Sequence, residues 1–112
     1  MDLTTLLRRV EMLRSWRVWT LRIAKIAKEL LPGSRVLMVG SVARGDYVGG
    51  SDVDVLVISP NAPEKPLEKA RVKALIEDRL NLPYYHPFEI HVLRPEEAKT
   101  YIERAKGCVV EL

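Results

Sequence analysis

The chain has little that could cross-link it or anchor it. It contains one cysteine, Cys108, which excludes an internal disulfide and a zinc site built from cysteines. Its apolar runs fall far short of the roughly 20 residues that cross a bilayer. Charged and apolar residues alternate too quickly in 1–13 for the core of a signal peptide. We therefore expect a cytoplasmic protein without a membrane segment, in which Cys108 is an ordinary small side chain.

Amide side chains are also scarce. The chain has no glutamine and two asparagines, Asn61 and Asn81, and its arginines outnumber its lysines. Because amides are thermolabile, this depletion hints at a thermophile source. At 112 residues, with 47% hydrophobic and 29% charged side chains, the chain has material for a single core. The prediction is one globular domain over 1–112.

The net charge is +3, and most of the excess lies within the first thirty residues. The basic side chains there are Arg8, Arg9, Arg14, Arg17, Arg22, Lys25 and Lys28. Such a surface is typical of a solvated helix. It would also suit an acidic partner protein or nucleic acid, and both alternatives stay open.

The hydrophobic periodicity divides the domain into three parts. Residues 1–31 form a helical segment, 35–93 a core that carries the motifs, and 95–112 a C-terminal helix and tail. A continuous helix over the first part would be about 43 Å long, more than so small a domain can cover. We expect a break near Ser15, or first turns that project and need a partner.

Strands and helices alternate through the rest of the chain. The expected strands are 35–39, 52–58 and 88–93, and the expected helices are 41–46, 67–80 and 95–107. This order predicts an α/β or α+β domain with a small sheet flanked by helices.

Two aspartates open a strand that is otherwise apolar. Asp52 and Asp54 are two residues apart, so their side chains share a face and repel each other. Glu89, in the third strand, joins that face if the two strands are neighbours. Carboxylates so grouped suit Mg²⁺, and two ions about 3.5–4 Å apart would suit phosphoryl transfer. His91, two residues further on, is more typical of a satisfied surface or core histidine than of a ligand.

A Gly-Ser turn precedes the aspartates. Gly40 ends the first strand, so a phosphate could approach the backbone, and the following helix would point free N–H groups at it. Ser41 adds a hydroxyl, and Arg44, one turn further, could bind a triphosphate or pair with Asp46. Ser51 directly precedes the first aspartate. The sequence therefore predicts a nucleotide site beside a metal site.

These residues resemble a known family. Gly40-Ser41, Arg44-Gly45 and Ser51-Asp52-x-Asp54-x-Leu56-Val57 resemble the signature of the polymerase-β-like nucleotidyltransferase superfamily. The short chain resembles its minimal nucleotidyltransferases, the MNT antitoxins that pair with HEPN-domain toxins. The resemblance covers Val36 to Leu93 and omits the first thirty residues and the tail after Gly107.

The resemblance implies a mixed sheet flanked by helices and a site built from the quoted residues. Asp52, Asp54 and Glu89 would be the catalytic and Mg²⁺-binding carboxylates, with Glu89 where the family most often has aspartate. The nucleotide-binding residues would be Gly40, Ser41, Arg44 and Ser51. The implied reaction moves AMP from ATP to a hydroxyl, with Glu89 as the base that draws the acceptor proton.

The resemblance also implies a partner. Small family members act as antitoxins, some by adenylylating a tyrosine of the HEPN toxin, so a hetero-oligomer is expected and a homo-oligomer stays open. The candidate contact surfaces are the N-terminal helix and the loop Tyr84-Tyr85-His86. Two alternatives remain: an antitoxin that neutralises its partner by contact alone, and a transferase acting on a small molecule or an RNA end.

Overall fold

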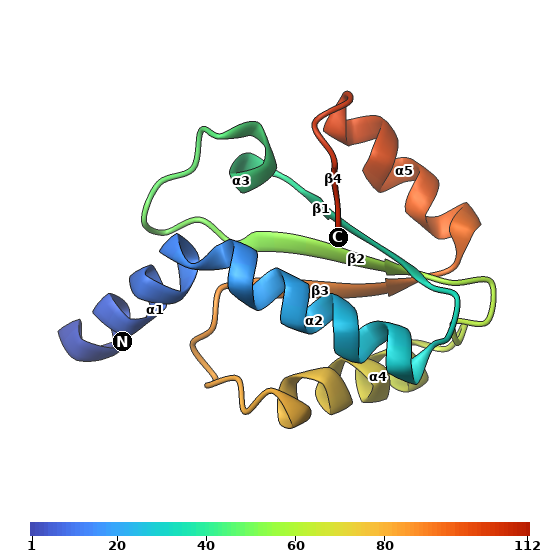
Figure 1. Ribbon diagram of the computed structural model, residues 1–112, viewed down its shortest axis with the longest axis horizontal. Coiled ribbons are helices and arrows are strands. Elements are labelled where there is room, and N and C mark those ends of the chain that lie inside the picture. Colours follow the sequence, from blue (N-terminus) through green and yellow to red (C-terminus); the bar gives the residue numbers. More distant parts are fainter.

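The computed structural model describes residues 1–112 as one mixed sheet between two helical layers (Figure 1). The elements, in chain order, are α1 (Leu3–Arg14), α2 (Trp16–Leu30), β1 (Arg35–Val39), α3 (Ser41–Arg44), β2 (Val53–Ile58), α4 (Pro66–Arg79), β3 (Phe88–Leu93), α5 (Pro95–Ala105) and β4 (Val110–Glu111). The α+β class and the small mixed sheet predicted from the sequence are confirmed. None of the five helices has both the length and the apolar character that a bilayer-spanning segment requires.

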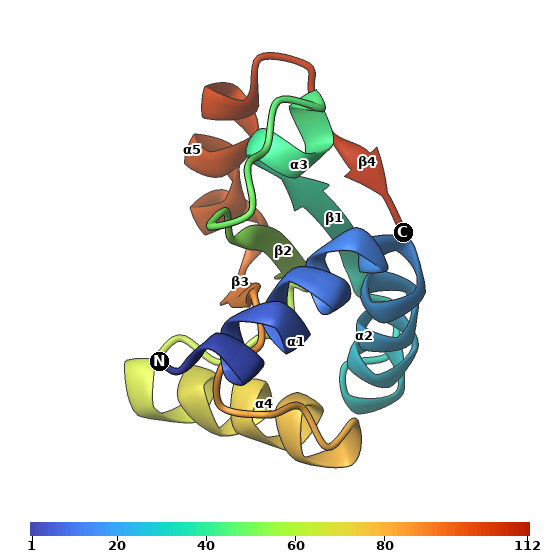
Figure 2. The ribbon, with the colours of Figure 1, turned by 90° about the vertical axis from the view of Figure 1, so that its left-hand side faces the viewer.

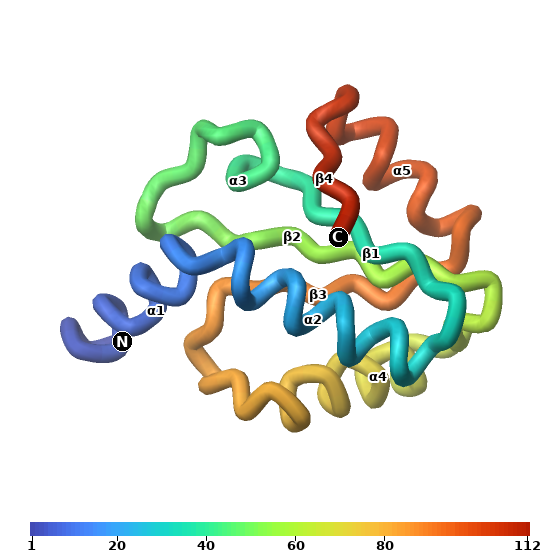
Figure 3. Tube along the Cα trace, in the orientation of Figure 1, coloured from blue at the N-terminus to red at the C-terminus, as the bar shows by residue number.

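The sheet has the strand order β3-β2-β1-β4. β2 and β3 are parallel and are joined through α4, whereas β1 is antiparallel to both of its neighbours. The chain path in Figure 3 shows α4 leaving the end of β2 and returning the chain to the start of β3. Because β2 and β3 are parallel, their first residues lie at the same edge of the sheet, where β1 ends.

The two faces of the sheet carry separate hydrophobic clusters. Figure 2 shows α2 and α4 on one side of the sheet and α5 on the other. The larger cluster packs one face against α2, α4 and the end of α1. Its buried members are Met12, Leu13, Ile23, Ala24, Ala27, Val36, Met38, Val42, Val53, Val55, Val57, Ile76, Phe88 and Ile90. The smaller cluster packs the other face against α5. Its buried members are Leu37, Val39, Leu56, Ile58, Leu93, Ala98 and Ala105.

The N-terminal segment breaks where the sequence interrupts its apolar stripe. Ser15 separates α1 from α2, and its amide donates to the carbonyl of Glu11 at 3.0 Å. The first turn of α1 is capped by Asp2, whose Oδ1 accepts from the Thr5 amide at 2.8 Å. The same turn projects from the sheet, and Leu3 is 70% exposed. Both expected features, a break and a projecting first turn, are therefore present.

The short strand β4 is absent from the sequence prediction. It pairs with β1 through Met38 and Val110, and the pairing is supported by two hydrogen bonds from Arg35 to Glu111, at 2.9 and 3.2 Å. These bonds hold the pKa of the Glu111 carboxyl below its ordinary 4.5. A two-residue strand has no measurable periodicity, so its pairing depends on the neighbouring strand rather than on local pattern.

Candidate active site

The predicted carboxylates gather at the edge where β2 and β3 begin. In the parallel register Asp54 is paired with Glu89, and in the antiparallel register Asp54 is paired with Val39. Adjacent strands lie about 4.7–4.9 Å apart, and paired residues point to the same face. The structure therefore places Glu89 beside Asp54 on the face that α5 covers further along.

Asp54 is the most constrained of the three carboxylates. Its Oδ1 lies 3.2 Å from Nε2 of His91, which follows Glu89 by two residues on the same face of β3. The ring of His91 in turn lies against the ring of Tyr101 in α5, with centroids 5.1 Å apart. The carboxylate of Asp54 is thereby oriented by a histidine that is itself packed in place. This contact gives His91 a role beyond that of a solvated surface residue.

The structure gives a second reason for a glycine at position 40, beside the close approach of a phosphate that the sequence suggested. Its φ of +91° is unfavourable for other residues, and a Cβ built on it would lie 2.7 Å from Oδ2 of Asp54. The group that closely approaches this glycine is therefore the side chain of Asp54. A larger residue at position 40 would push that carboxylate away from its place.

Asp52 lies just before β2 and is held from another direction. Its side chain is 57% exposed, and its Oδ1 accepts a hydrogen bond of 2.6 Å from Nη2 of Arg9 in α1. The expectation that Asp52 and Asp54 would form one matched pair thus needs refinement. Each carboxylate has its own partner, from a different part of the fold.

Glu89 is exposed and makes no side-chain hydrogen bond within the chain. In chemical type the three carboxylates fit a hard divalent cation such as Mg²⁺, and the register brings two of them side by side. As the side chains are placed, no three histidine, cysteine, aspartate or glutamate residues are close enough together to hold a metal ion. The donor set fits, and Asp52 would have to turn from Arg9 to complete it.

The other predicted nucleotide-binding residues, which follow β1 or precede β2, differ in their hydrogen-bond partners. Arg44, at the end of α3, lies beside Asp46 with Nε and Oδ2 3.4 Å apart. Ser41 begins α3, and its hydroxyl has no hydrogen-bond partner in the chain. Ser51 instead closes its own loop, because its Oγ accepts from the Val48 amide at 3.0 Å. Its role in nucleotide binding stays a prediction.

A cavity of about 210 Å³ opens beside Asp54. Its lining residues are Val39, Gly40, Arg44, Asp54, His91, Tyr101, Arg104 and Ala105. Three of them, Tyr101, Arg104 and Ala105, come from α5 and were not among the predicted site residues. Arg104 forms no ion pair, whereas Arg44 has Asp46. Tyr101 and Arg104 are three residues apart, so both lie on one side of α5. The sequence shows this spacing, but only the fold shows that this side faces the cavity.

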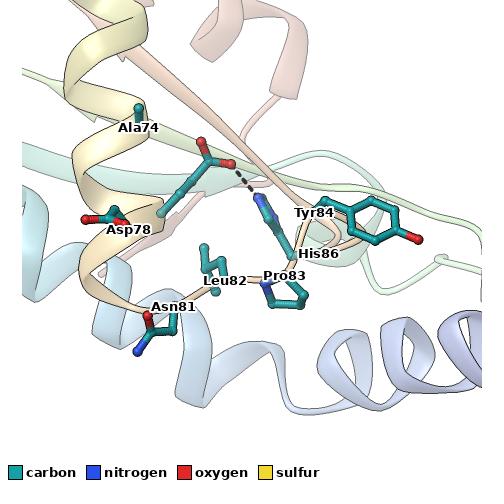
Figure 4. Close-up of a pocket in the computed structure, with 8 residues that line it drawn as sticks. Ala74, Asp78, Asn81, Leu82, Pro83, Tyr84 and His86 are labelled. Atoms are coloured by element: carbon teal, nitrogen blue, oxygen red, sulfur yellow. Dashed lines mark hydrogen bonds and ion pairs between the residues drawn. The ribbon is translucent and has the colours of Figure 1, made fainter.

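The loop Tyr84-Tyr85-His86 borders a larger hollow of about 490 Å³ on the far side of the sheet (Figure 4). Nδ1 of His86 accepts a hydrogen bond from the Phe88 N–H at 3.0 Å. The ring proton is therefore on Nε2, which donates to Oε2 of Glu77 at 2.6 Å. These bonds fasten the loop to α4. The hollow contains none of the predicted catalytic residues, while Tyr84 is 87% exposed at its rim.

Comparisons with known proteins agree with this arrangement. A family model described as a nucleotidyltransferase domain matches residues 21–110. A crystal structure described as a nucleotidyltransferase from Sulfolobus solfataricus is 19% identical, with a TM-score of 0.57 over 96% of this chain and 82% of that one. A toxin–antitoxin crystal structure with AMP-PNP is 15% identical, with a TM-score of 0.56 over 80% and 68% of the two chains. No curated protein matches the chain.

Proposed function

Because this chain belongs to the nucleotidyltransferase domain family, we propose that it transfers AMP from ATP to a hydroxyl group of a partner protein. The observation that carries the proposal is the pairing of Asp54 with Glu89 at the sheet edge, next to a cavity lined by Gly40 and Arg44. Acidic residues beside an anion-accepting pocket are the arrangement that nucleotide chemistry needs. A transferase is what the family implies, and the acceptor and nucleotide are our inference.

The basic end of the cavity suits the triphosphate. Arg44 and Arg104 come from different helices and line the same cavity as Gly40 and Asp54. Guanidinium groups bind phosphate oxygens through charge-assisted hydrogen bonds. We assign the β- and γ-phosphates to these two arginines, with Ser41 and Ser51 as additional donors.

The acidic end suits the reacting centre. Asp52, Asp54 and Glu89 would hold Mg²⁺, two ions by analogy with other carboxylate clusters, and the metal would neutralise charge on the phosphates. The acceptor oxygen forms a bond to the α-phosphorus as the bond to the β-phosphate oxygen breaks. Pyrophosphate leaves, and the hydroxyl proton passes to the carboxylate of Glu89. His91 keeps Asp54 in place during these changes.

We further propose that the acceptor is a tyrosine of a HEPN-domain toxin and that the chain is its antitoxin, acting in the cytoplasm. One of the structures similar in fold to this chain is a toxin–antitoxin crystal structure with AMP-PNP, which supports a partner of this kind. The candidate contact surfaces are the projecting part of α1, where Leu3 and Leu7 are 70% and 55% exposed, and the exposed ring of Tyr84. Apolar side chains so exposed at one end of a small domain suit a protein contact.

One observation favours a second candidate, an antitoxin that acts by contact alone. Asp52 is paired with Arg9, and the carboxylates as placed form no three-ligand cluster. A chain that kept the fold without assembling the metal site would still present α1 and Tyr84 to a partner. The two candidates differ in whether AMP is transferred from ATP to the partner protein.

The test is transfer of label from α-³²P-ATP, with Mg²⁺, to the product of a neighbouring gene. Asp52→Asn provides the blank, and γ-labelled ATP shows which phosphate moves. Label on the partner from the α but not the γ position is the expected result. A tight complex that acquires no label would favour the contact-only antitoxin.

A further inference from the structure

Arg9 connects the N-terminal helix to the acidic site. Its guanidinium donates to Oδ1 of Asp52 at 2.6 Å, to the carbonyl of Ser51 at 3.2 Å and to the carbonyl of Gly49 at 3.5 Å. These partners are forty or more residues away in the sequence. The contacts join α1 to the loop that leads into β2.

The setting of this arginine differs from that of an ordinary surface ion pair. Its side chain is 11% exposed, although Asp52 is 57% exposed. A guanidinium withdrawn from water in this way depends on the oxygen atoms around it, and a carboxylate is the strongest of them. The basic side chain of most other ion pairs is more exposed than Arg9, as in Arg35–Glu111, where the arginine is 61% exposed.

The segment that supplies Arg9 lies outside the matched domain. The family model covers 21–110, whereas α1 ends at Arg14. Arg9 therefore reaches Asp52 from a segment that precedes the residues matched by the family model. It brings a positive charge onto one of the carboxylates that the proposed reaction requires.

We propose that Arg9 and the divalent metal compete for Asp52, so that α1 sets how readily the metal site assembles. The inference rests on the proposed function, which makes Asp52 a metal ligand. A cation hydrogen-bonded to Oδ1 occupies a coordination direction of that oxygen and repels a second cation nearby. Asp54 has no arginine or lysine within ion-pair distance, and its neighbour is His91. The proposed competition therefore concerns Asp52.

The coupling works in both directions. If Arg9 weakens metal binding, then bound metal must weaken the hold of Arg9 on Asp52 by the same factor. Any movement of α1 that withdraws Arg9 would free Asp52 for the metal. Arg9 is thus a positioning residue, acting through Asp52 rather than on the substrate.

The experiment measures Mn²⁺ binding to the full chain by titration calorimetry, without nucleotide. Arg9→Ala should bind Mn²⁺ roughly threefold to thirtyfold more tightly than the wild type, the range expected for loss of one nearby charge. Arg8→Ala is the matched control, because it removes the same charge from an exposed neighbour on α1 that has no ion pair. It should stay within about twofold of the wild type.

Stability provides a readout that does not depend on activity. Arg9→Ala should raise the unfolding equilibrium constant about threefold to tenfold without metal, and the difference should shrink in saturating Mn²⁺. If Arg9→Ala fails to fold, Arg9→Lys keeps the charge but loses the fork that reaches three oxygens. It should then show a smaller increase in Mn²⁺ affinity.

Equal Mn²⁺ affinity in Arg9→Ala and Arg8→Ala would refute the competition. Weaker Mn²⁺ binding in Arg9→Ala would also refute it, because Arg9 would then support the metal site. Failure of the proposed function has a different pattern. In that case Asp54→Asn would bind Mn²⁺ as the wild type does, or no variant would bind it, and the competition would fall with it.

Discussion

The two faces of the sheet are covered to different extents, and the difference locates the site. One face is closed by two long helices and the end of a third, with fourteen buried residues between them, whereas the other has α5 and seven. In Figure 2, α2 and α4 lie on one side of the sheet and α5 on the opposite side. The smaller cover leaves the start of β2 and β3 open, and there Asp54, Glu89 and His91 meet solvent. Most of the buried core lies on the closed face, and the proposed chemistry lies on the open one.

The largest effect is expected on the open face, from Asp54→Asn. Loss of this carboxylate should lower AMP transfer at least about a hundredfold, because it removes a ligand of the metal and the partner of His91. The melting temperature should be unchanged or slightly higher, because repulsion among the carboxylates falls. Label transfer and thermal unfolding measure the two quantities. Asp78→Asn, on α4, is the control, and transfer at the wild-type rate by Asp54→Asn would refute the assignment.

A substitution on the closed face should give the opposite pattern. Ile76 is fully buried and is the only buried residue of α4. Ile76→Ala should lower the free energy of unfolding by about 2–5 kcal/mol through lost burial and the cavity left behind. Denaturant unfolding measures the loss, and Leu75→Ala at an exposed neighbour is the control. Transfer per folded molecule should be unaffected, and a matching loss of transfer would show that the faces are not separable.

Gly40→Ala should affect both stability and transfer, because Gly40 joins the core strand β1 to the site. The positive φ and the contact with Asp54 should cost about 1–3 kcal/mol of stability. Transfer should fall by more than the folded fraction does, since the methyl group displaces the carboxylate. Gly45 has a similar φ of +82° and open space around it. Gly45→Ala therefore measures the cost of the backbone conformation without a contact with Asp54. Equal losses of transfer in the two variants would argue against the contact with Asp54.

The smallest effect is expected from Arg104→Ala, which tests the extent of the open site. The KM for ATP should rise about tenfold, with little change in kcat, if the guanidinium binds the outer phosphates in ground and transition states alike. Binding of ATP should weaken while binding of AMP stays constant, because AMP lacks those phosphates. Arg71→Ala, on α4 of the closed face, is the control. An unchanged ATP affinity would confine the site to the residues predicted from sequence.

Much of the fold followed from local pattern. Strands 35–39 and 88–93 were predicted with the bounds that the structure has, and the break at Ser15 followed from residue type. The last helix was predicted to run to Gly107 and ends at Ala105. The Asp-x-Asp pair and the Gly-Ser turn indicated the family, which is confirmed. These features are readable because helix and strand periodicity and turn chemistry are properties of neighbouring residues.

The sequence by itself determined the elements other than the short strand β4, and which residue types could carry nucleotide chemistry. Only the tertiary structure decided that Glu89 lies in register with Asp54, that Tyr101 and Arg104 face the same cavity, and that Arg9 reaches Asp52. Glu89 and Asp54, Arg9 and Asp52, and α5 and the cavity beside Asp54 are all far apart in the chain. Their proximity depends on how strands pair and helices pack around a common core, which no local pattern specifies.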